Sequence, residues 1–378
     1  MKKIAIIGST GSIGRQALEV VRRYPDKLKV VALSAGNNSQ LFLEQVREFK
    51  PQIATLSKEI EINREQYKGV DFYFGENAFT NAIGDFLDMA LVSLVGYKGI
   101  LAVLDCVGKG VDIALANKES LVVGGDIVIK KAREKGVKIY PVDSEHSAIW
   151  QALSFDFDRD FKRIILTASG GAFRDFSIEQ LKSVKAKDAL KHPNWSMGNK
   201  ITVDCATLVN KAFEVIEAKW LYNTTFDKID VIIHKESIIH SMVEYCDGST
   251  MAQLSYPTME LPIQLALLYP ERVPFDKPSI DFSLLNNLSF SKLDEDRFPC
   301  FNLVVESCKR GGCYPAVVNG ANDCLVDLFL KDKIAFTDMY KGILECVNAF
   351  KGEYRGDFES LDNANKFAVE YIKQRFGG

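Results

Sequence analysis

The sequence lacks a long apolar run and an excess of basic residues. Its most apolar stretch, residues 89–107, carries Lys98, Asp105 and two glycines, whereas a membrane-spanning helix needs about 20 consecutive apolar residues. The formal net charge is −3 and the lysines and arginines are scattered along the chain. A dedicated nucleic-acid-binding domain usually has a basic face. We therefore expect neither a membrane nor a nucleic acid as a partner.

The sequence also lacks an export signal and a paired-cysteine metal motif. The opening residues, MKKIAIIG, resemble the start of a signal peptide, but the apolar part ends after four residues. We expect a cytoplasmic protein whose eight cysteines are reduced. No CxxC pair occurs, and Cys308 and Cys313 lie five apart. Because structural zinc takes four such ligands, we expect no metal–thiolate site here.

Short apolar segments alternate with helical ones through the first 143 residues. We expect strands at 2–8, 28–34, 52–56, 89–94, 112–116 and 137–142, and helices at 12–24 and 126–135. Repeated strand–helix alternation is typical of a doubly wound parallel sheet. The fold class is therefore α/β, with an N-terminal Rossmann-type sheet.

The pattern changes after residue 143. Two strands are expected at 163–168 and 229–234, and Asp247-Gly248 predicts an antiparallel hairpin between 242–246 and 250–255. Four prolines lie within 270–299, and helical periodicity continues at 300–310, 315–331, 337–350 and 360–375. We predict domains at 1–143 and 144–269, a linker at 270–299, and a C-terminal helical bundle at 300–378.

A glycine-rich turn follows the first strand and opens a helix. Gly8, Gly11 and Gly14 have the spacing GxxGxxG. Glycines let the backbone approach a pyrophosphate, and the helix N-terminus offers free N–H groups and a favourable dipole. This context favours a dinucleotide site; the alternative is a glycine-rich turn without a ligand.

The end of the second expected strand bears on the choice of cofactor. NAD-dependent enzymes usually carry Asp or Glu there, to bind the ribose 2′-hydroxyl. This chain has Gly36, Asn37 and Asn38 instead. The absence of a carboxylate removes a repulsion toward a 2′-phosphate, so we predict NADP(H) over NAD(H). The alternative is that Asn37 caps a turn.

Two carboxylates follow the strand at 137–142. Asp143 and Glu145 are two residues apart at the end of an extended run, so both can point to one side. Hard oxygen ligands at a strand's carboxyl end suit Mg²⁺ or Mn²⁺, and Glu214 could supply a third ligand. The alternative is that one of the pair caps the helix that follows, in which His146 is a helix residue.

Residues 192–220 begin as a loop with His192 and Trp195 and end as a helix. Asn210, Lys211 and Glu214 share one face of that helix. Either this face belongs to a lidded site for a charged small molecule, or it is a surface helix with one salt bridge. Two further polar turns, at 116–120 and 167–171, each fit an ordinary turn when taken alone.

Together, these motifs resemble one enzyme family. GSTGSIG, ANKESLV, PVDSEHSAIWQ, SGGAFR, HPNWSMGNKITVDCAT and NKAFEVIEAKWL occur in the order and spacing of the 1-deoxy-D-xylulose 5-phosphate reductoisomerases. These are NADPH-dependent enzymes of the non-mevalonate isoprenoid pathway. The resemblance covers essentially the whole chain.

The resemblance implies a homodimer that converts 1-deoxy-D-xylulose 5-phosphate to 2-C-methyl-D-erythritol 4-phosphate, and it implies roles for matching residues. The divalent ion would be held by Asp143, Glu145 and Glu214, which with Lys118 form the catalytic set. NADPH would contact Gly8, Thr10, Gly11, Ser12, Ile13, Gly36, Asn37, Asn38, Asn117, Glu119 and Gly198. Substrate would contact Lys118, Ser144, Glu145, Ser169, His192, Trp195, Met197, Cys205, Asn210, Lys211 and Glu214. Residues 190–199 would form a flap over the sugar phosphate.

The chain departs from the family pattern at two positions. Cys205 stands where the family usually has a serine that binds the substrate phosphate, and a thiol is a weaker donor. Asn37 stands where many relatives have a basic residue near the 2′-phosphate. Two other functions compete: another NADP-dependent aldehyde or semialdehyde dehydrogenase, which would rely on a catalytic Cys or Lys, and a non-catalytic dinucleotide sensor, which would not need the three carboxylates.

Overall fold

The computed structural model describes residues 1–191, 197–285 and 287–377, which form two compact units. Unit 1 consists of Met1–Ser120, Val128–Ser147 and Thr258–Lys277. Unit 2 consists of Leu121–Ile127, Ala148–Pro257 and Pro278–Gly378. Both units are discontinuous in sequence, because the chain leaves unit 1 and returns to it. The predicted functional domain bounds at 143, 269 and 299 remain predictions.

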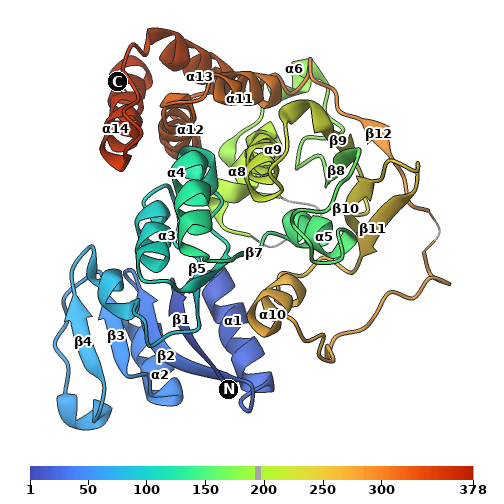
Figure 1. Ribbon diagram of the computed structural model, residues 1–378. Helices are drawn as coiled ribbons and strands as arrows, with labels where there is room; N and C mark the ends of the chain where they lie inside the picture. The colour runs from blue at the N-terminus through green and yellow to red at the C-terminus, as the bar shows by residue number, and fades with distance from the viewer. Residues whose placement is uncertain (192–196, 286, 378) are drawn as a thin grey trace. The chain divides into compact units, whose positions relative to one another are not determined.

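Unit 1 is built on a parallel sheet of seven strands, in the order β4-β3-β2-β1-β5-β6-β7 (Figure 1). The strands are β1 Lys2–Ile7, β2 Leu28–Ala35, β3 Ile53–Leu56, β4 Asp71–Phe74, β5 Met89–Val92, β6 Asp112–Leu115 and β7 Ile139–Pro141. All neighbouring pairs are parallel. The strand order changes direction between β1 and β5, the place where open α/β sheets bind ligands. The predicted Rossmann-type sheet is confirmed.

The helices of unit 1 include three that the sequence analysis did not predict. The helices are α1 Ser12–Arg23, α2 Ser39–Phe49, α3 Gly99–Gly108, α4 Glu119–Lys135 and α10 Glu260–Leu268, with 3₁₀ turns at Arg64–Tyr67 and Ala78–Ala82. Those not predicted are α2, α3 and α10. The middle of α4 belongs to unit 2. The α3 segment is apolar almost throughout, so it has no amphipathic period to reveal a helix. The helix predicted at 126–135 matches the part of α4 that follows Gly124, where non-helical dihedral angles (φ −133°, ψ 30°) divide α4 into two helical parts.

The segment containing α10 returns the chain to unit 1 after the hairpin. It packs against α1, and Arg23 of α1 pairs with Glu260 of α10. Lys277 pairs with the same carboxylate, and the Lys27 ammonium lies 2.6 Å from Glu271. Residues 270–277 of the predicted linker therefore belong to unit 1, where they form ion pairs that sequence spacing alone does not indicate.

Unit 2 contains a mixed sheet of five strands, in the order β11-β10-β8-β9-β12. The strands are β8 Arg163–Ala168, β9 Ile229–Ile233, β10 Ile239–Glu244, β11 Thr250–Leu254 and β12 Ser291–Lys292. β8 pairs with β9 in parallel, and β10 is antiparallel to β8 and β11. The predicted hairpin at Asp247-Gly248 is confirmed, with Gly248 at φ +86°.

Some of the remaining helices of unit 2 precede or interrupt the strands of this sheet in sequence, and the others follow them (Figure 1). They are α5 Ser144–Ala152, which unit 1 shares, α6 Ile178–Leu181, α7 Ala186–Ala189, α8 Asn199–Thr207 and α9 Val209–Leu221, with a 3₁₀ turn at Phe226–Lys228. The C-terminal helices are α11 Cys300–Lys309, α12 Tyr314–Leu330, α13 Asp338–Ala349 and α14 Phe358–Phe376. They match the predicted helical bundle to within two residues at each end.

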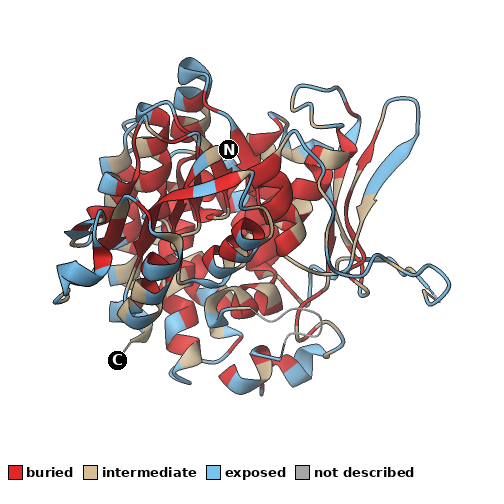
Figure 2. Cartoon of the chain, turned by 90° about the horizontal axis from the view of Figure 1, so that it is seen from below, coloured by how far each residue is buried: buried red, intermediate tan, exposed pale blue. Residues whose placement is uncertain are grey.

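Buried residues are concentrated in the strands and the helices, and α9 and α12 are buried on most sides (Figure 2). The last four residues of β1 and all of β5 are buried, as parallel strands covered on both faces should be. Burial raises the pKa of the Cys308 and Cys313 thiols. Within the described part of the chain, no helix combines the length and apolarity needed to cross a bilayer.

Candidate active site

The turn after β1 has the geometry of a pyrophosphate cradle. Gly8 adopts φ +99°, and a Cβ there would lie 2.8 Å from the Ser93 carbonyl oxygen. At Gly14, a Cβ would lie 2.3 Å from the Gly8 carbonyl oxygen, so α1 packs directly on the turn. The predicted glycine spacing therefore reflects two close backbone approaches.

The first turn of α1 is available to an anion. Gly11 is its N-cap, no side chain caps the helix, and its first turn holds no acidic residue. Unpaired N–H groups and the helix dipole at such an end favour a phosphate. The exposed Gly11 and Ser12 present this end to solvent. A dinucleotide pyrophosphate fits the local structure.

The segment Gly36–Asn38 follows β2 at the same edge of the sheet. Asn37 and Asn38 are exposed. The Asn38 side chain caps α2 by accepting a hydrogen bond of 3.2 Å from the Leu41 N–H. A capping role, which the sequence analysis considered for Asn37, therefore falls on Asn38. Residues 36–38, which follow β2, include no Asp or Glu.

Asn117, after β6, ties two loops together. Its Nδ2 lies 2.9 Å from the carbonyl oxygens of Leu94 and Gly96 and from Glu119 Oε2. At Gly99, a Cβ would fall 2.2 Å from Asn117 Oδ1. The buried Asn117 thus fixes the loop after β5 against the start of α4, which is a structural reason for the asparagine.

Lys118 and Asp143 form an ion pair at the ends of two neighbouring strands. The Lys118 ammonium lies 2.7 Å from Asp143 Oδ2, and both side chains are largely buried. Asp143 also accepts a 3.0 Å hydrogen bond from the Ser144 N–H where α5 begins. The Ser144 hydroxyl donates to Glu145 Oε2 at 2.5 Å. Asp143 therefore both accepts a hydrogen bond at the start of α5 and pairs with Lys118. His146 lies within α5, as expected.

In unit 2, the turn after β8 packs against the end of α8. Gly170 and Gly171 adopt φ +84° and +70°, and a Cβ at Gly171 would lie 2.3 Å from the Cys205 carbonyl oxygen. The Gly171 N–H donates to Ser169 Oγ at 3.3 Å. The structure therefore brings together the predicted phosphate contacts Ser169 and Cys205.

The polar face of α9 is buried, so the alternative of a surface salt bridge is wrong. Asn210, Lys211 and Glu214 are 8%, 4% and 1% exposed. Asn210 donates to Glu214 Oε1 at 2.5 Å, and the Lys211 ammonium pairs with the other carboxylate oxygen. Lys211 also donates to the Thr167 carbonyl oxygen at 2.5 Å, beside Ser169. Buried charges are costly unless they are paired, so this cluster is a strong candidate for function.

The predicted flap lies only partly within the described residues. His192 and Trp195 fall outside them. Met197 is half-buried, and Gly198 is the exposed N-cap of α8. The Gly198 carbonyl oxygen accepts a hydrogen bond of 2.8 Å from the Thr202 hydroxyl.

Comparison with known proteins gives the same family over nearly the whole length. A model of 1-deoxy-D-xylulose 5-phosphate reductoisomerase matches residues 4–125, and models of C-terminal domains of that enzyme match residues 139–222 and 254–371. A reductoisomerase from Bacillus thuringiensis subsp. konkukian is 43% identical, with 99% of this chain and 98% of the relative covered. One from Rippkaea orientalis is 45% identical, with 98% and 96% covered.

The chain belongs to the 1-deoxy-D-xylulose 5-phosphate reductoisomerase family. The enzyme class expected from the sequence motifs is confirmed, and the semialdehyde dehydrogenase and sensor alternatives are set aside.

Solved structures of reductoisomerases agree with the fold. One, in complex with NADPH, fosmidomycin and magnesium, is 34% identical with a TM-score of 0.93 and covers 100% of this chain and 98% of its own. The enzyme from Zymomonas mobilis in complex with NADPH is also 34% identical, with a TM-score of 0.93 and 99% of both chains covered. The predicted fold class is therefore confirmed.

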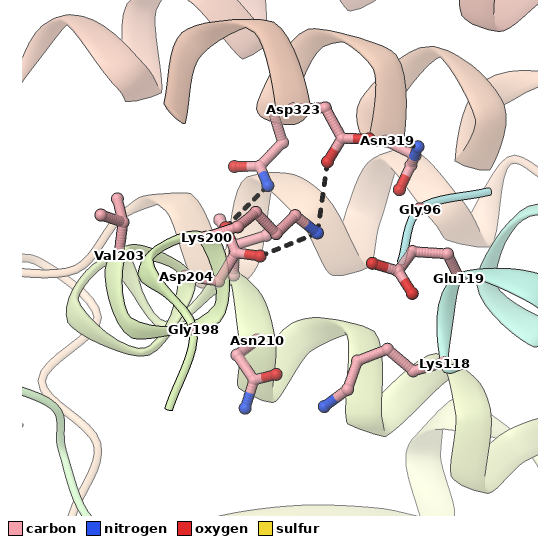
Figure 3. Close-up of polar contacts among 12 residues, drawn as sticks. Gly96, Lys118, Glu119, Gly198, Lys200, Val203, Asp204, Asn210, Asn319 and Asp323 are labelled. Carbon is pink, nitrogen blue, oxygen red and sulfur yellow. Dashed lines mark hydrogen bonds and ion pairs between the residues drawn. The ribbon is translucent and has the colours of Figure 1, made fainter. Parts of the chain in front are cut away.

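The sequence analysis did not predict an ion-pair network that joins α8 to α12 in this reductoisomerase-family chain. Figure 3 shows the Lys200 ammonium between two carboxylates, at 3.0 Å from Asp204 and 3.2 Å from Asp323. The buried Asn322 donates to the other Asp204 oxygen at 2.8 Å. Asp323 and Asn322 lie on α12, so the network joins the C-terminal helices to α8. The four-residue spacing of Lys200 and Asp204 is a sequence signal, but it does not reveal the partner on α12.

Proposed function

We propose that the protein rearranges 1-deoxy-D-xylulose 5-phosphate and reduces the product to 2-C-methyl-D-erythritol 4-phosphate, using NADPH and a divalent metal ion. The proposal rests on family membership and, in the structure, on the buried Asn210–Lys211–Glu214 cluster. An amide, an ammonium and a carboxylate held together away from water suit a charged ligand better than a stability role.

The NADPH site is proposed at the turn after β1, with the strand ends of β2 and β6. The free first turn of α1 would take the pyrophosphate, and Asn37 and Asn38 would lie near the 2′-phosphate. A reductoisomerase structure that contains NADPH supports this assignment. The remaining proposed contacts are Gly8, Thr10, Gly11, Ser12, Ile13, Gly36, Asn117, Glu119 and Gly198.

The metal site is proposed at Asp143, Glu145 and Glu214. All three offer hard oxygen donors, which suit Mg²⁺ or Mn²⁺, and a reductoisomerase structure contains magnesium. When bound, the ion would act as a Lewis acid and template for the substrate oxygens. The 2.7 Å pair with Lys118 holds the Asp143 carboxylate in one orientation at the end of β7.

The substrate phosphate is proposed to bind where the turn after β8 meets α8 and α9. The Ser169 hydroxyl, the Asn210 amide and the Lys211 ammonium would carry most of the contact, with the Cys205 thiol as a weaker donor. Ser144, Glu145 and the flap residues His192, Trp195 and Met197 would contact the rest of the sugar phosphate.

In the first proposed step, the carbon skeleton rearranges without a change in oxidation state. Lys118 would stabilise the negative charge that develops on the substrate oxygens, an interaction that gains strength when water is excluded. In the second step, the aldehyde carbon accepts a hydride from NADPH and its oxygen accepts a proton, which leaves NADP⁺. Closure of 190–199 would retain the aldehyde between the two steps.

The protein is proposed to act as a homodimer through β11. Among the described residues, this strand is at the edge of its sheet and pairs with β10 alone, and Met251 is 53% exposed. An exposed edge strand is a surface that a second copy can pair with. Light scattering should give twice the monomer mass, and Met251→Asp should lower it while Met251→Leu should not.

We also infer that the protein acts in the cytoplasm. The buried thiols of Cys106 and Cys300 have pKa values raised to about 12 by burial, and both are reduced. Such thiols are compatible with a reducing compartment.

The product identifies the reaction. With 1-deoxy-D-xylulose 5-phosphate, NADPH and Mg²⁺, we expect NADP⁺ and 2-C-methyl-D-erythritol 4-phosphate in equal amounts, measured by mass spectrometry. A straight-chain reduced sugar phosphate would show reduction without rearrangement and would contradict the proposal.

A further inference from the structure

A buried glutamine on α2 makes two hydrogen bonds to the turn after β1. Gln45 is 3% exposed and Ser9 is 0% exposed. The Ser9 hydroxyl donates to Gln45 Oε1 at 2.7 Å, and Gln45 Nε2 donates to the Ser9 carbonyl oxygen at 3.0 Å. One amide therefore satisfies both a side-chain group and a backbone group of the same residue within the proposed pyrophosphate turn.

Other hydrogen bonds that support this turn come from the sheet. The N–H groups of Gly8 and Ser9 donate to the Ser34 carbonyl oxygen at 2.9 and 2.8 Å. The Ser93 hydroxyl donates to the Ile7 carbonyl oxygen at 2.9 Å. These contacts hold the turn at the strand ends, whereas Gln45 connects it to a helix.

That helix, α2, begins next to the Asn37–Asn38 segment, which is the proposed contact for the 2′-phosphate. α2 starts at Ser39, directly after Asn37 and its N-cap Asn38. Its buried residues are Phe42, Gln45 and Val46, of which only Gln45 is polar. A buried amide among apolar neighbours is costly unless both of its ends are satisfied. Here they are satisfied by the turn, so the pair specifies one placement of α2 against Gly8–Gly11.

We infer that Gln45 is a positioning residue for the dinucleotide: it fixes the pyrophosphate turn relative to the Asn37–Asn38 segment, so that both ends of the adenosine half meet their contacts together. The inference rests on the proposed NADPH site. Without this pair, part of the binding free energy would be spent on ordering the two segments.

The test is direct NADPH binding by fluorescence, at a temperature where circular dichroism shows every variant folded. Gln45→Met keeps the side chain's length and helix preference but removes both hydrogen bonds. We expect the dissociation constant for NADPH to rise about tenfold, the scale expected for losing a buried hydrogen-bonded pair. With saturating NADPH, kcat and the KM for substrate should stay at the wild-type values.

Gln40→Met is the matched control, because Gln40 lies on the exposed side of the same helix. It should leave the dissociation constant unchanged. A role in stability alone would lower the melting temperature of Gln45→Met but leave NADPH binding as in the wild type, and that result would overturn the inference. If Gln45→Met does not fold, Ser9→Ala decides: it should raise the constant about threefold, and a wild-type value would reject the inference.

A fragment of the cofactor separates joint positioning from local damage. Adenosine 2′-monophosphate can contact the Asn37–Asn38 segment without reaching the turn, so its inhibition constant should change by less than about twofold. If Gln45→Met weakened the binding of this fragment and of NADPH by the same factor, Gln45 would act on α2 alone, and that result would contradict joint positioning. If wild-type protein did not bind NADPH, the proposed function itself would fail, which is a distinguishable result.

Discussion

At the scale of single residues, the most informative side chain is Glu214. It is 1% exposed, and both of its oxygens accept hydrogen bonds from its own helix, from Asn210 and Lys211. A carboxylate in this setting is expensive to bury and is held in one orientation. The same reasoning applies to Asp143, which Lys118 and the start of α5 hold from two sides. Both carboxylates are thus held in one orientation, which suits the proposed ligand set.

Asp143→Asn should abolish turnover and weaken binding of the divalent ion, because an amide carries no charge to balance the metal. Activity and Mn²⁺ titration by electron paramagnetic resonance measure the two effects. Asp160→Asn removes an exposed carboxylate and is the control. Wild-type activity in Asp143→Asn would reject the proposed ligand set.

Cys205→Ser should tighten binding of the substrate phosphate. A hydroxyl is a better donor than a thiol, and one neutral hydrogen bond contributes about 1 kcal/mol, so the KM for substrate should fall about fivefold at most. Steady-state kinetics measure this change. An unchanged KM, with NADPH saturating, would mean that position 205 does not contact the phosphate.

At the scale of elements, the helices on either side of the proposed phosphate site have different supports. α9 is anchored to β8 by Lys211, whereas α8 is anchored to α12 by the Lys200–Asp204–Asp323 network (Figure 3). The two helices are separated at Leu208, which adopts φ +61°. The C-terminal helices therefore contribute to the site through the placement of α8.

Asn322→Ala should destabilise the protein by roughly 1–3 kcal/mol, because it leaves a buried carboxylate oxygen of Asp204 without its donor. Urea denaturation measures the change. Asn363 is exposed on α14, so Asn363→Ala should be nearly neutral. Equal midpoints for the two variants would show that the Asn322 contact has no net effect on stability.

Several elements could be predicted from the sequence because their signals are local. β8 was predicted to the residue, and the hairpin followed from Asp247-Gly248. The helix α3 was missed because its apolar residues show no period. α10 was missed because what places it, such as the Arg23–Glu260 pair, lies more than 200 residues away in sequence.

The proposed site residues rest on the same kind of local signal, and Gln45 is one of the residues that such signals missed. The glycine turn, Asp143 and the α9 face all follow from spacing or from the ends of strands. Gln45 does not attract notice as a glutamine in a helix. Its spacing of three and one from Phe42 and Val46 places it on the apolar face, and a polar residue there is a detectable sign of a buried contact.

At the scale of the whole molecule, the two units carry different sets of proposed site residues. Unit 1 carries the proposed NADPH turn, Lys118, Asp143 and Glu145, and unit 2 carries Ser169, Cys205 and the α9 cluster. The proposed reaction needs a reduced dinucleotide and a divalent ion. The family match over both units is consistent with this division of roles.

NADPH oxidation in the presence of 1-deoxy-D-xylulose 5-phosphate, followed by absorbance, tests this account most directly. After removal of divalent ions with a chelator, we predict no oxidation, and addition of Mg²⁺ or Mn²⁺ should restore it. Oxidation should also require the ketose phosphate. Substrate-dependent oxidation that persists at full rate in the chelated protein would contradict the metal-dependent reductoisomerase reaction.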